Sequence, residues 1–574
     1  MCSFLVRSIH GANNTSGEEN YATISYYWGV EDEAADRPLK RIELQTESNP
    51  PRTRPWDIRE NLWAALRSLR SSTKDRLFWV DALCINYTKE LQDTAEKTSQ
   101  TKLKRHIFMG ANNLCFWLGD DEKIRPAFMF ISTMLEKVGG ISELVNDHKY
   151  IPSWLSFIAL LNNKAFSRLW LLQEVTISQR RSVTIHAGNL SKNYLDFVDA
   201  VGIFISCRGA ISDLFRKHQA DHKALSDHGI SLTELFVNVS TNALRYARKD
   251  SEAQRLLALE DLVSQLVNFG CGNPLDRVFS MLALAKDKTR YLDINYSKDT
   301  IVVYKEFVRH VIITSQSLDI VCRRWATPHQ GTPYPSWILA SPSLPSMFRG
   351  RINADSLVGL PGRSHYNASR NKPAYDIHMM SWNADILPAS GFVLDTISKL
   401  GDWASQGIIL SQWLSLGGCN LSDGELVTDA FWRTLVANLG PNGCNPPPWY
   451  PRALGFCIDH RTPNGDIDTE KLLAKDTDPL IKEFLKRVQS VIWNRKFLVT
   501  KQLGLVGLVP MEAQIDDSIC ILYGCSVPVV LRRHSDGQFW RFIGECYVHD
   551  MMDGEAVELM EGREHFKAEI FPLK

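Results

Sequence analysis

Short apolar runs alternate with longer amphipathic segments along the first third of the chain. The apolar runs are rich in β-branched and aromatic residues and predict strands at residues 21–28, 76–85, 113–118 and 182–187. Between them, apolar residues at helical spacing predict a helix at residues 61–69, and a polar segment predicts another at residues 89–109. Further helices are predicted at residues 126–138 and 153–162 and around Trp170. Strands that alternate with helices are typical of a parallel sheet with crossover helices on both faces. We therefore predict a doubly wound α/β domain over residues 1–190.

The pattern changes twice after residue 190. Apolar stripes at helical spacing predict helices at residues 232–244, 256–267 and 301–313, and so a helical middle region over residues 191–335. Strand-like segments then return at residues 346–359, 379–387 and 391–400 and from residue 497 to the C-terminus. We expect residues 336–574 to form a small β-barrel or sandwich, interrupted by a mostly helical insertion at about residues 404–495.

The overall charge gives no reason to expect a nucleic acid or an anionic membrane as the main partner. Lys plus Arg equals Asp plus Glu, 65 against 65, so neither sign is in excess. The longest nearly apolar run, residues 519–531, is too short to span a bilayer, and the N-terminus lacks a charged segment followed by an apolar one. We therefore expect an intracellular, cytoplasmic protein without a membrane span.

Signatures of the commonest enzyme and metal-binding classes are missing from the sequence. It contains no GxxxxGK[ST] phosphate loop, no GxSxG elbow, no HExxH and no GxGxxG. The twelve cysteines show no paired CxxC spacing, and we expect reduced thiols. His218, His222 and His228 lie in a strongly polar segment without further ligands at metal-binding spacing. We predict no metal site and no bound cofactor.

The run from residue 166 to residue 175 carries the most specific candidate chemistry. Trp170 and Glu174 stand four residues apart, so a helix places the ring and the carboxylate on one face. Such a pair at the mouth of an α/β sheet suits sugar chemistry. Alternatively, Trp170 belongs to a core stripe, and Glu174 faces solvent or pairs with Arg168.

Three stretches carry a family resemblance: residues 21–29 (YATISYYWG), 77–86 (LFWVDALCIN) and 166–175 (FSRLWLLQEV). In this order and spacing they resemble the fungal heterokaryon incompatibility (HET) family. The resemblance continues downstream at residues 273–279, 334–337, 504–510 and 544–555, and so covers nearly the whole chain. Tyr87 stands where the family usually has Gln, and Phe108 where it has Tyr. These departures weaken any role for the two side chains but not the fold.

The resemblance implies non-self recognition, a form of innate immunity, and programmed cell death when genetically different fungal cells fuse. It implies protein partners and self-association on activation. HET domains look distantly like Toll/interleukin-1 receptor (TIR) domains, which are flavodoxin-like, and some of which cleave NAD with a single Glu in a Trp-x-x-x-Glu helix. Trp170 and Glu174 stand at that spacing. This implies an NAD glycohydrolase with Glu174 as the catalytic residue and NAD as substrate, restrained by the rest of the chain.

A flavodoxin-like sheet of strand order 2-1-3-4-5 binds ligands beyond the carboxyl ends of strands one and three. Those ends are Trp28-Gly29 and Gly119-Asp120. The glycines let the backbone approach a ligand closely, and Trp28 offers a flat surface for a ring. The predicted ligand-binding residues are Ser25, Trp28, Gly29, Gly119, Asp120 and Trp170.

Other polar residues near these strand ends have two interpretations each. Ser25 contacts ribose or phosphate, or else hydrogen-bonds the backbone. Asp81 is a buried, paired carboxylate or part of the site, and Asn86 caps the next helix or touches ligand.

One carboxylate can suffice for cutting the bond between nicotinamide and ribose. The pyridinium leaving group needs no proton, so the protein has only to stabilise the oxocarbenium-like ribosyl group. Glu174 could offset that developing positive charge. As an alternative, the domain assembles with other signalling domains and carries no chemistry. The two functions differ in whether killing requires Glu174.

Overall fold

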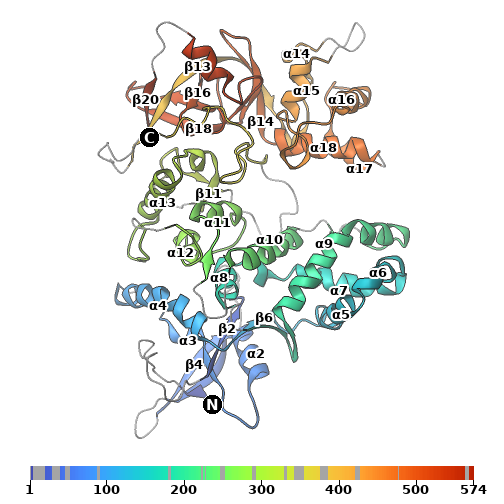
Figure 1. The fold of residues 1–574 in the computed structure, drawn as a ribbon, viewed down its shortest axis with the longest axis vertical. Coiled ribbons are helices and arrows are strands. Elements are labelled where there is room, and N and C mark those ends of the chain that lie inside the picture. The colour runs from blue at the N-terminus through green and yellow to red at the C-terminus, as the bar shows by residue number, and fades with distance from the viewer. Residues whose placement is uncertain are drawn as a thin grey trace. The chain divides into compact units, whose positions relative to one another are not determined.

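The chain folds into two compact units, Met1–Thr300 and Ile301–Lys574 (Figure 1). The computed structural model describes residues 2–3, 20–28, 39–45, 52–86, 91–178, 182–221, 224–225, 228–245, 253–287, 292–328, 333–341, 354–374, 385–419, 427–475, 478–562 and 568–574. A compact unit can hold more than one domain, so the predicted division at residues 190 and 335 stays a prediction.

A five-stranded sheet forms the centre of the first unit. Its order is β5 (Leu77–Trp79), β2 (Tyr21–Tyr26), β6 (Asn113–Trp117), β7 (Val183–Ala187) and β8 (Leu190–Asn193). If these five strands are numbered from one to five in sequence order, the sheet has the expected order 2-1-3-4-5. The first four strands in the sheet are parallel. β8 is antiparallel to β7, because the two-residue turn between them can join only antiparallel neighbours. The predicted sheet is thus confirmed with a mixed edge.

Helices cover both faces of this sheet. Successive residues of β2 point to opposite faces. Ile24 and Tyr26 pack on one face against Leu62 and Ala65 of α2 (Glu60–Leu69). Ser25 points to the other face, where α8 (Leu169–Ser178) lies against the sheet and α4 (Leu91–Gly110) lies against α8. This arrangement confirms the doubly wound layout.

One local prediction in this part of the chain is wrong, and one hairpin was not predicted. The strand predicted at residues 76–85 ends at Trp79, and the chain turns into the short helix α3 (Asp81–Cys84). The Asp81 carboxylate accepts a hydrogen bond from the Ala82 amide at 2.8 Å, which favours the turn. The hairpin of β3 (Leu39–Gln45) and β4 (Thr53–Arg59), with β1 (Cys2–Ser3) alongside, gave no apolar signal because most of its described side chains are exposed.

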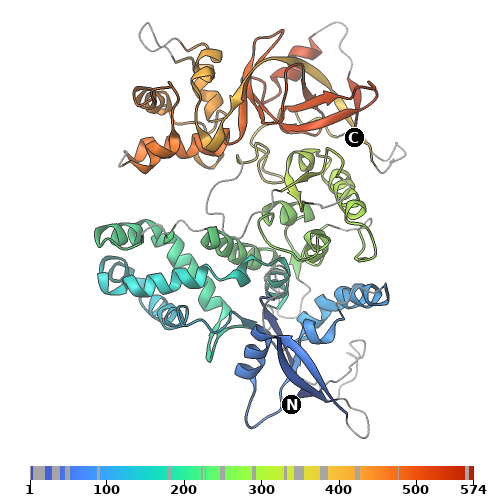
Figure 2. The same cartoon turned by 180° about the vertical axis from the view of Figure 1, so that it is seen from behind.

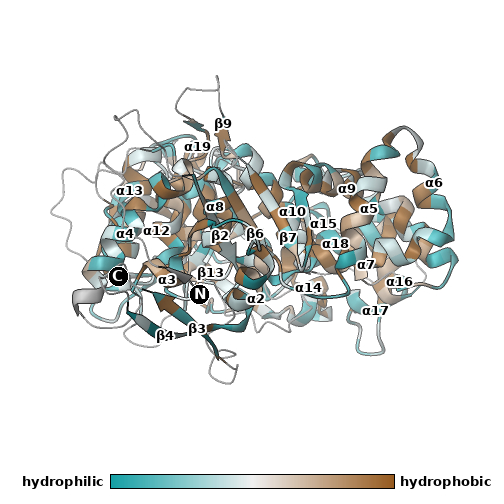
Figure 3. Cartoon of the chain, turned by 90° about the horizontal axis from the view of Figure 1, so that it is seen from below, coloured by the Kyte–Doolittle hydropathy of each residue, from teal (hydrophilic) through white to brown (hydrophobic). Residues whose placement is uncertain are grey.

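The central helix α8 is enclosed by its own unit. It lies against β2 and is covered by α10 and α12 (Figure 1). Every residue from Leu171 to Ser178 is buried, and the helix is largely hydrophobic (Figure 3). The remaining helices of the unit are α5 (Arg125–Glu136), α6 (Ile141–Asn146), α7 (Ile151–Leu161), α9 (Tyr194–Lys217), α10 (His228–Asn242), α11 (Leu259–Gln265) and α12 (Asp276–Leu282). The predicted helices around Trp170 and at residues 232–244 and 256–267 are confirmed.

Short elements join these helices. They are the 3-10 turns η2 (Val138–Gly140), η3 (His148–Tyr150) and η4 (Lys164–Ser167), and the strand pair β9 (Leu244–Arg245) and β10 (Gln254–Arg255).

The second unit contains a closed five-stranded barrel. The long strand β13 (Leu387–Trp403) pairs with both β16 (Ser518–Leu522) and β20 (Glu569–Leu573), and β17 (Val529–Arg533) and β18 (Trp540–Glu545) complete the ring. The other half of β13 continues into β14 (Arg495–Thr500), β15 (Val506–Pro510) and β19 (Tyr547–Val548) (Figure 2). The predicted barrel and the strand at residues 391–400 are confirmed.

The other strand predictions in this unit had different outcomes. The segments predicted at residues 346–359 and 379–387 lie largely outside the described residues, and residues 354–359 form no strand.

Helices interrupt the barrel sequence between β13 and β14. The insertion holds α14 (Ser411–Leu416), α15 (Asp429–Leu435), α16 (Tyr450–Asp459), α17 (Thr469–Ala474) and α18 (Pro479–Ile492). Outside it lie α13 (Thr300–Ser315), η6 (Asp319–Cys322), β11 (Arg324–Ala326), β12 (Leu339–Ala340) and α19 (Glu555–Glu561). Within the described ranges, none of the helices is both long enough and apolar enough to cross a bilayer.

Candidate functional site

A buried carboxylate, Glu174, connects the central helix to the sheet. Its side chain is 4% exposed. Oε2 accepts a hydrogen bond from Ser25 Oγ at 2.5 Å, and Oε1 accepts one from Lys104 Nζ at 3.1 Å. Both oxygens are therefore held by side chains from distant parts of the chain, one from β2 and one from α4. These two contacts hold the carboxylate in one orientation.

Lys104 joins two carboxylates and a ring. Its side chain is also 4% exposed, and Nζ lies 3.5 Å from Asp81 Oδ2 as well as 3.1 Å from Glu174 Oε1. The same ammonium group lies 4.3 Å from the centre of the Trp170 ring, within the range of a cation–π contact. An ammonium has three donors and no acceptor, so this environment suits only its charged form. We call Ser25, Asp81, Lys104 and Glu174 the buried cluster.

The charges of the buried cluster perturb one another. Burial alone would lower the pKa of Lys104, but the carboxylates of Glu174 and Asp81 outweigh it and raise the pKa, so Lys104 stays charged. Burial raises the pKa of Glu174, and the negative charge of Asp81 raises it further, against the lowering effects of Lys104 and Ser25. Perturbed carboxylates of this kind are found at active sites and in structural ion pairs alike.

The buried cluster lies near the carboxyl ends of β5 and β2. Ser25 is the last but one residue of β2, and Asp81 follows β5 by two residues. Beyond Ser25, Trp28 is half-buried, and its ring stacks on that of Tyr26 with centres 6.1 Å apart. The structure thus brings Ser25, Trp170 and Glu174 together as the sequence suggested. Gly29 lies outside the described residues.

Gly119 and Asp120 belong to a neighbouring turn. Gly119 has φ of +103°, a conformation that favours glycine, and its carbonyl accepts a hydrogen bond from the Gly188 amide at 2.9 Å. The Asp120 carboxylate pairs with Arg125. Across the part of the chain that the structure describes, neither residue hydrogen-bonds the buried cluster. Their role in ligand binding stays a prediction.

Lys104 is the member of the cluster that sequence reasoning missed. The helix at residues 89–109 is mostly polar, and a face of such a helix is usually solvated. One signal was present, since Thr101, Lys104, Ile107 and Phe108 recur at helical spacing and all four are buried. A lysine in register with apolar neighbours could have been assigned to the inner face. Its partner Glu174 is accordingly buried and does not pair with Arg168.

Metal ligands do not converge in the described ranges. Among these residues, no group of three or more His, Cys, Asp or Glu side chains is placed to hold an ion. His218, one of the histidines considered from sequence, stacks against His148 with ring centres 5.3 Å apart.

Comparison with protein families assigns two segments of the chain. Residues 21–174 match the family described as heterokaryon incompatibility protein (HET), and residues 476–568 match the Het-6 β-barrel domain. The first match begins at the first residue of β2 and ends at Glu174, so it spans the whole buried cluster. The second covers β14 to β19 but not β13 and β20, the two strands that close the barrel.

A curated relative supports the same assignment. The chain is 28% identical over 156 residues to "Heterokaryon incompatibility protein 6, OR allele" of Neurospora crassa, an alignment that covers 25% of this chain and 21% of the relative. No solved structure matches the chain, so the flavodoxin-like and TIR-like assignment of the first unit stays a prediction. The two domain matches and this relative therefore make these segments of the chain similar to heterokaryon incompatibility (HET) domain proteins.

Proposed function

We propose that this protein acts in heterokaryon incompatibility, and that its HET domain does so by hydrolysing the bond between nicotinamide and ribose in NAD. The matched domain and the name of the Neurospora crassa relative support the first part. The second part rests on Glu174, a carboxylate that is 4% exposed and held in one orientation by Ser25 and Lys104 near the carboxyl end of β2. That observation carries the proposal.

In the proposed reaction, nicotinamide leaves as a neutral group and the ribosyl carbon becomes cationic. Glu174 would stabilise that cation, and a water molecule would then complete the hydrolysis. A carboxylate shielded from bulk water acts more strongly on a nearby charge than an exposed one does, because the local dielectric is lower. Lys104 and Asp81 would be positioning residues, since they act through Glu174.

The proposed role requires the ionised form of Glu174. Because burial and Asp81 raise its pKa, we expect activity to increase with pH as the group loses its proton, over a range above the ordinary pKa of a glutamate. A reaction that used Glu174 as a proton donor would instead weaken over the same range.

The test is nicotinamide release from NAD by the purified full-length protein. Glu174→Gln keeps the shape of the side chain but removes its charge and replaces one accepting oxygen by a donating NH2 group. We expect release to fall about 100-fold or more, as when one preorganised transition-state contact is removed. Glu143→Gln is the matched control, because Glu143 also pairs with lysines but lies exposed on α6. Release that is absent from the wild type, or equal in the Glu174→Gln protein, would refute the enzymatic proposal.

A second candidate function is assembly without chemistry. It is favoured by the fact that both oxygens of Glu174 already have partners within the chain, which is what a purely structural ion pair requires. Expression of Glu174→Gln in fungal cells separates the two. Killing that persists in a folded Glu174→Gln protein would support assembly, whereas loss of killing together with loss of nicotinamide release would support the enzyme.

A further inference from the structure

Two arginines face one indole ring at the end of β2. Arg168 Cζ lies 5.7 Å and Arg59 Cζ lies 5.9 Å from the centre of the Trp28 ring. Arg168 Cζ also lies 5.9 Å from the ring of Tyr27. All four side chains are half-buried, and each contact is within the range of about 6 Å for a cation–π interaction. The two guanidinium groups therefore share one aromatic platform.

Neither arginine has a carboxylate partner among the described residues. Arg59 donates a hydrogen bond to the main-chain carbonyl of Trp28, and the Arg168 guanidinium lies over the rings of Tyr27 and Trp28. Elsewhere in the same unit, Arg41 and Arg125 form ion pairs with aspartates. Two like charges beside one ring repel each other, so a bound anion would relieve an unfavourable interaction as well as gain favourable ones.

These cations lie close to the buried cluster. Arg168 immediately precedes α8, and Glu174 follows it by six residues, or about 9 Å along the helix axis. Both arginines act on the same buried hydroxyl as the carboxylates. The pKa of Tyr26 is raised well above its usual value by burial and by Asp81 and Glu174, while Arg59 and Arg168 oppose the shift. The arginines over Trp28 thus also act on Tyr26, whose ring stacks on that of Trp28.

We propose that Arg168 and Arg59, mounted on Trp28, form a phosphate-binding subsite that takes the pyrophosphate group of a dinucleotide. A planar guanidinium can donate two parallel hydrogen bonds to a phosphate, and its face can stack on an aromatic ring at the same time. The indole face would also support a base or a nicotinamide ring next to the phosphates. The assignment to a dinucleotide rests on the proposed function, but the affinity for pyrophosphate does not require cleavage.

The test is calorimetric binding of inorganic pyrophosphate and of ADP-ribose to the full-length protein. Arg168→Gln removes the charge, and Arg168→Lys keeps the charge but not the planar group. Arg67→Gln is the matched control, because Arg67 is an exposed arginine that lies over Trp63, with Cζ 5.2 Å from the ring centre.

We expect wild type and Arg67→Gln to bind both probes with similar Kd values. Arg168→Gln should raise both Kd values at least about 10-fold, and Arg168→Lys should fall between, since a point charge replaces a bidentate donor. Absent binding to the wild type, or unchanged binding in Arg168→Gln, would overturn the subsite. Binding that follows this pattern without any nicotinamide release would uphold the subsite and refute only the proposed hydrolysis.

Discussion

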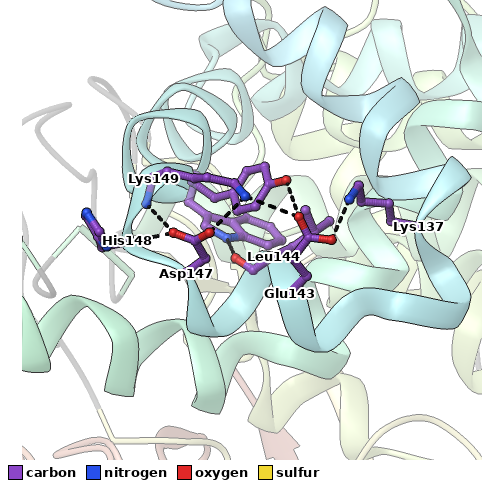
Figure 4. A network of polar contacts seen from close by, with 8 residues as sticks. Lys137, Glu143, Leu144, Asp147, His148 and Lys149 are labelled. Carbon is purple, nitrogen blue, oxygen red and sulfur yellow. Dashed lines mark hydrogen bonds and ion pairs between the residues drawn. The ribbon is translucent and has the colours of Figure 1, made fainter.

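The first unit holds two networks of lysines and carboxylates that differ in exposure and in construction. In the exposed network, Lys149 Nζ lies 2.8 Å from Asp147 Oδ2 and 3.2 Å from Glu143 Oε1, and Lys137 Nζ lies 2.5 Å from Glu143 Oε2 (Figure 4). Its side chains are between 34% and 54% exposed. In the buried cluster, the side chains of the Lys104–Glu174 pair are each 4% exposed. Similar chemical groups are thus used in two dielectric environments.

The two networks also differ in how far along the chain they reach. The exposed network lies entirely within residues 137–149, where α5, α6 and η3 follow one another. The buried cluster draws its four residues from β2, α3, α4 and α8. Water can solvate an exposed charge that loses its partner, but a buried charge has no such substitute. The buried cluster therefore connects four separate elements, whereas the exposed network connects only residues that are neighbours in the chain.

The pKa values of the two glutamates, Glu143 and Glu174, are shifted in opposite directions. Hydrogen bonds from Lys137, Tyr150 and Lys149 lower the pKa of Glu143 to about 2. Burial raises the pKa of Glu174, although it too is bonded to a lysine. The comparison shows that desolvation, and not the presence of a lysine, decides the sign at Glu174.

Removing one lysine from each network should give the largest difference. Lys104→Met leaves the carboxylates of Asp81 and Glu174 without their cation in a buried site, and we expect it to lower the free energy of unfolding of the first unit by about 3–5 kcal/mol. Lys149→Met, the matched control, should leave stability nearly unchanged because water replaces the lost partner. Native-state hydrogen exchange of the β2 and α8 amides reports this unit separately from the second. Equal effects of the two substitutions would show that burial does not distinguish the networks.

A hydroxyl that donates to a buried charge should matter more than one that donates to a neutral carbonyl. Ser25→Ala removes the 2.5 Å hydrogen bond to Glu174, and we expect a loss of about 1.5–3 kcal/mol. Ser156→Ala removes a 2.7 Å hydrogen bond to the Lys123 carbonyl and should cost about 0.5–1.5 kcal/mol. The same exchange experiment measures both. A larger loss from Ser156→Ala would contradict the charge-assisted bond at Ser25.

Local signals predicted the frame of this site well. β2, β6 and α8 follow from apolar runs and helical spacing, and the position of Trp170 and Glu174 on one helix follows from their separation by four residues. The sheet order also agreed with the prediction, because short crossovers and helices on both faces leave few arrangements.

The pairing within the site could not be predicted from local signals. Whether Glu174 faces solvent or the sheet depends on α10 and α12, which cover α8 from later parts of the chain. Lys104 stands on a mostly polar helix, and its burial depends on contact between α4 and α8. The strand predicted through residue 85 failed at Asp81, where a side-chain hydrogen bond to the next amide favours a turn over continued apolar pairing. Each miss arose where tertiary contact or side-chain capping outweighed the apolar pattern.

Acid titration should reveal the smallest effect. The contributions of Glu143 and Glu174 to the free energy of unfolding should change with pH in opposite directions. Because the folded-state pKa of Glu143 is depressed to about 2, its contribution is present above the unfolded pKa of about 4.3 and is lost as pH falls toward 2. The folded-state pKa of Glu174 is raised, so the folded state binds its proton more tightly than the unfolded state does, and stability falls as pH rises from about 4.3 through the folded pKa.

The matched variants Glu143→Gln and Glu174→Gln separate these two contributions. As pH falls, the stability advantage of wild type over Glu143→Gln should shrink, while wild type should gain stability relative to Glu174→Gln. Hydrogen exchange of α6 and α8 amides at a series of pH values, in wild type and in each variant, measures both differences. Differences of the same sign would mean that Lys104 outweighs desolvation and keeps Glu174 ionised well below neutral pH. Glu174 would then be a charged group at every pH at which the protein stays folded, and the expected increase of nicotinamide release with pH would have to arise from another residue.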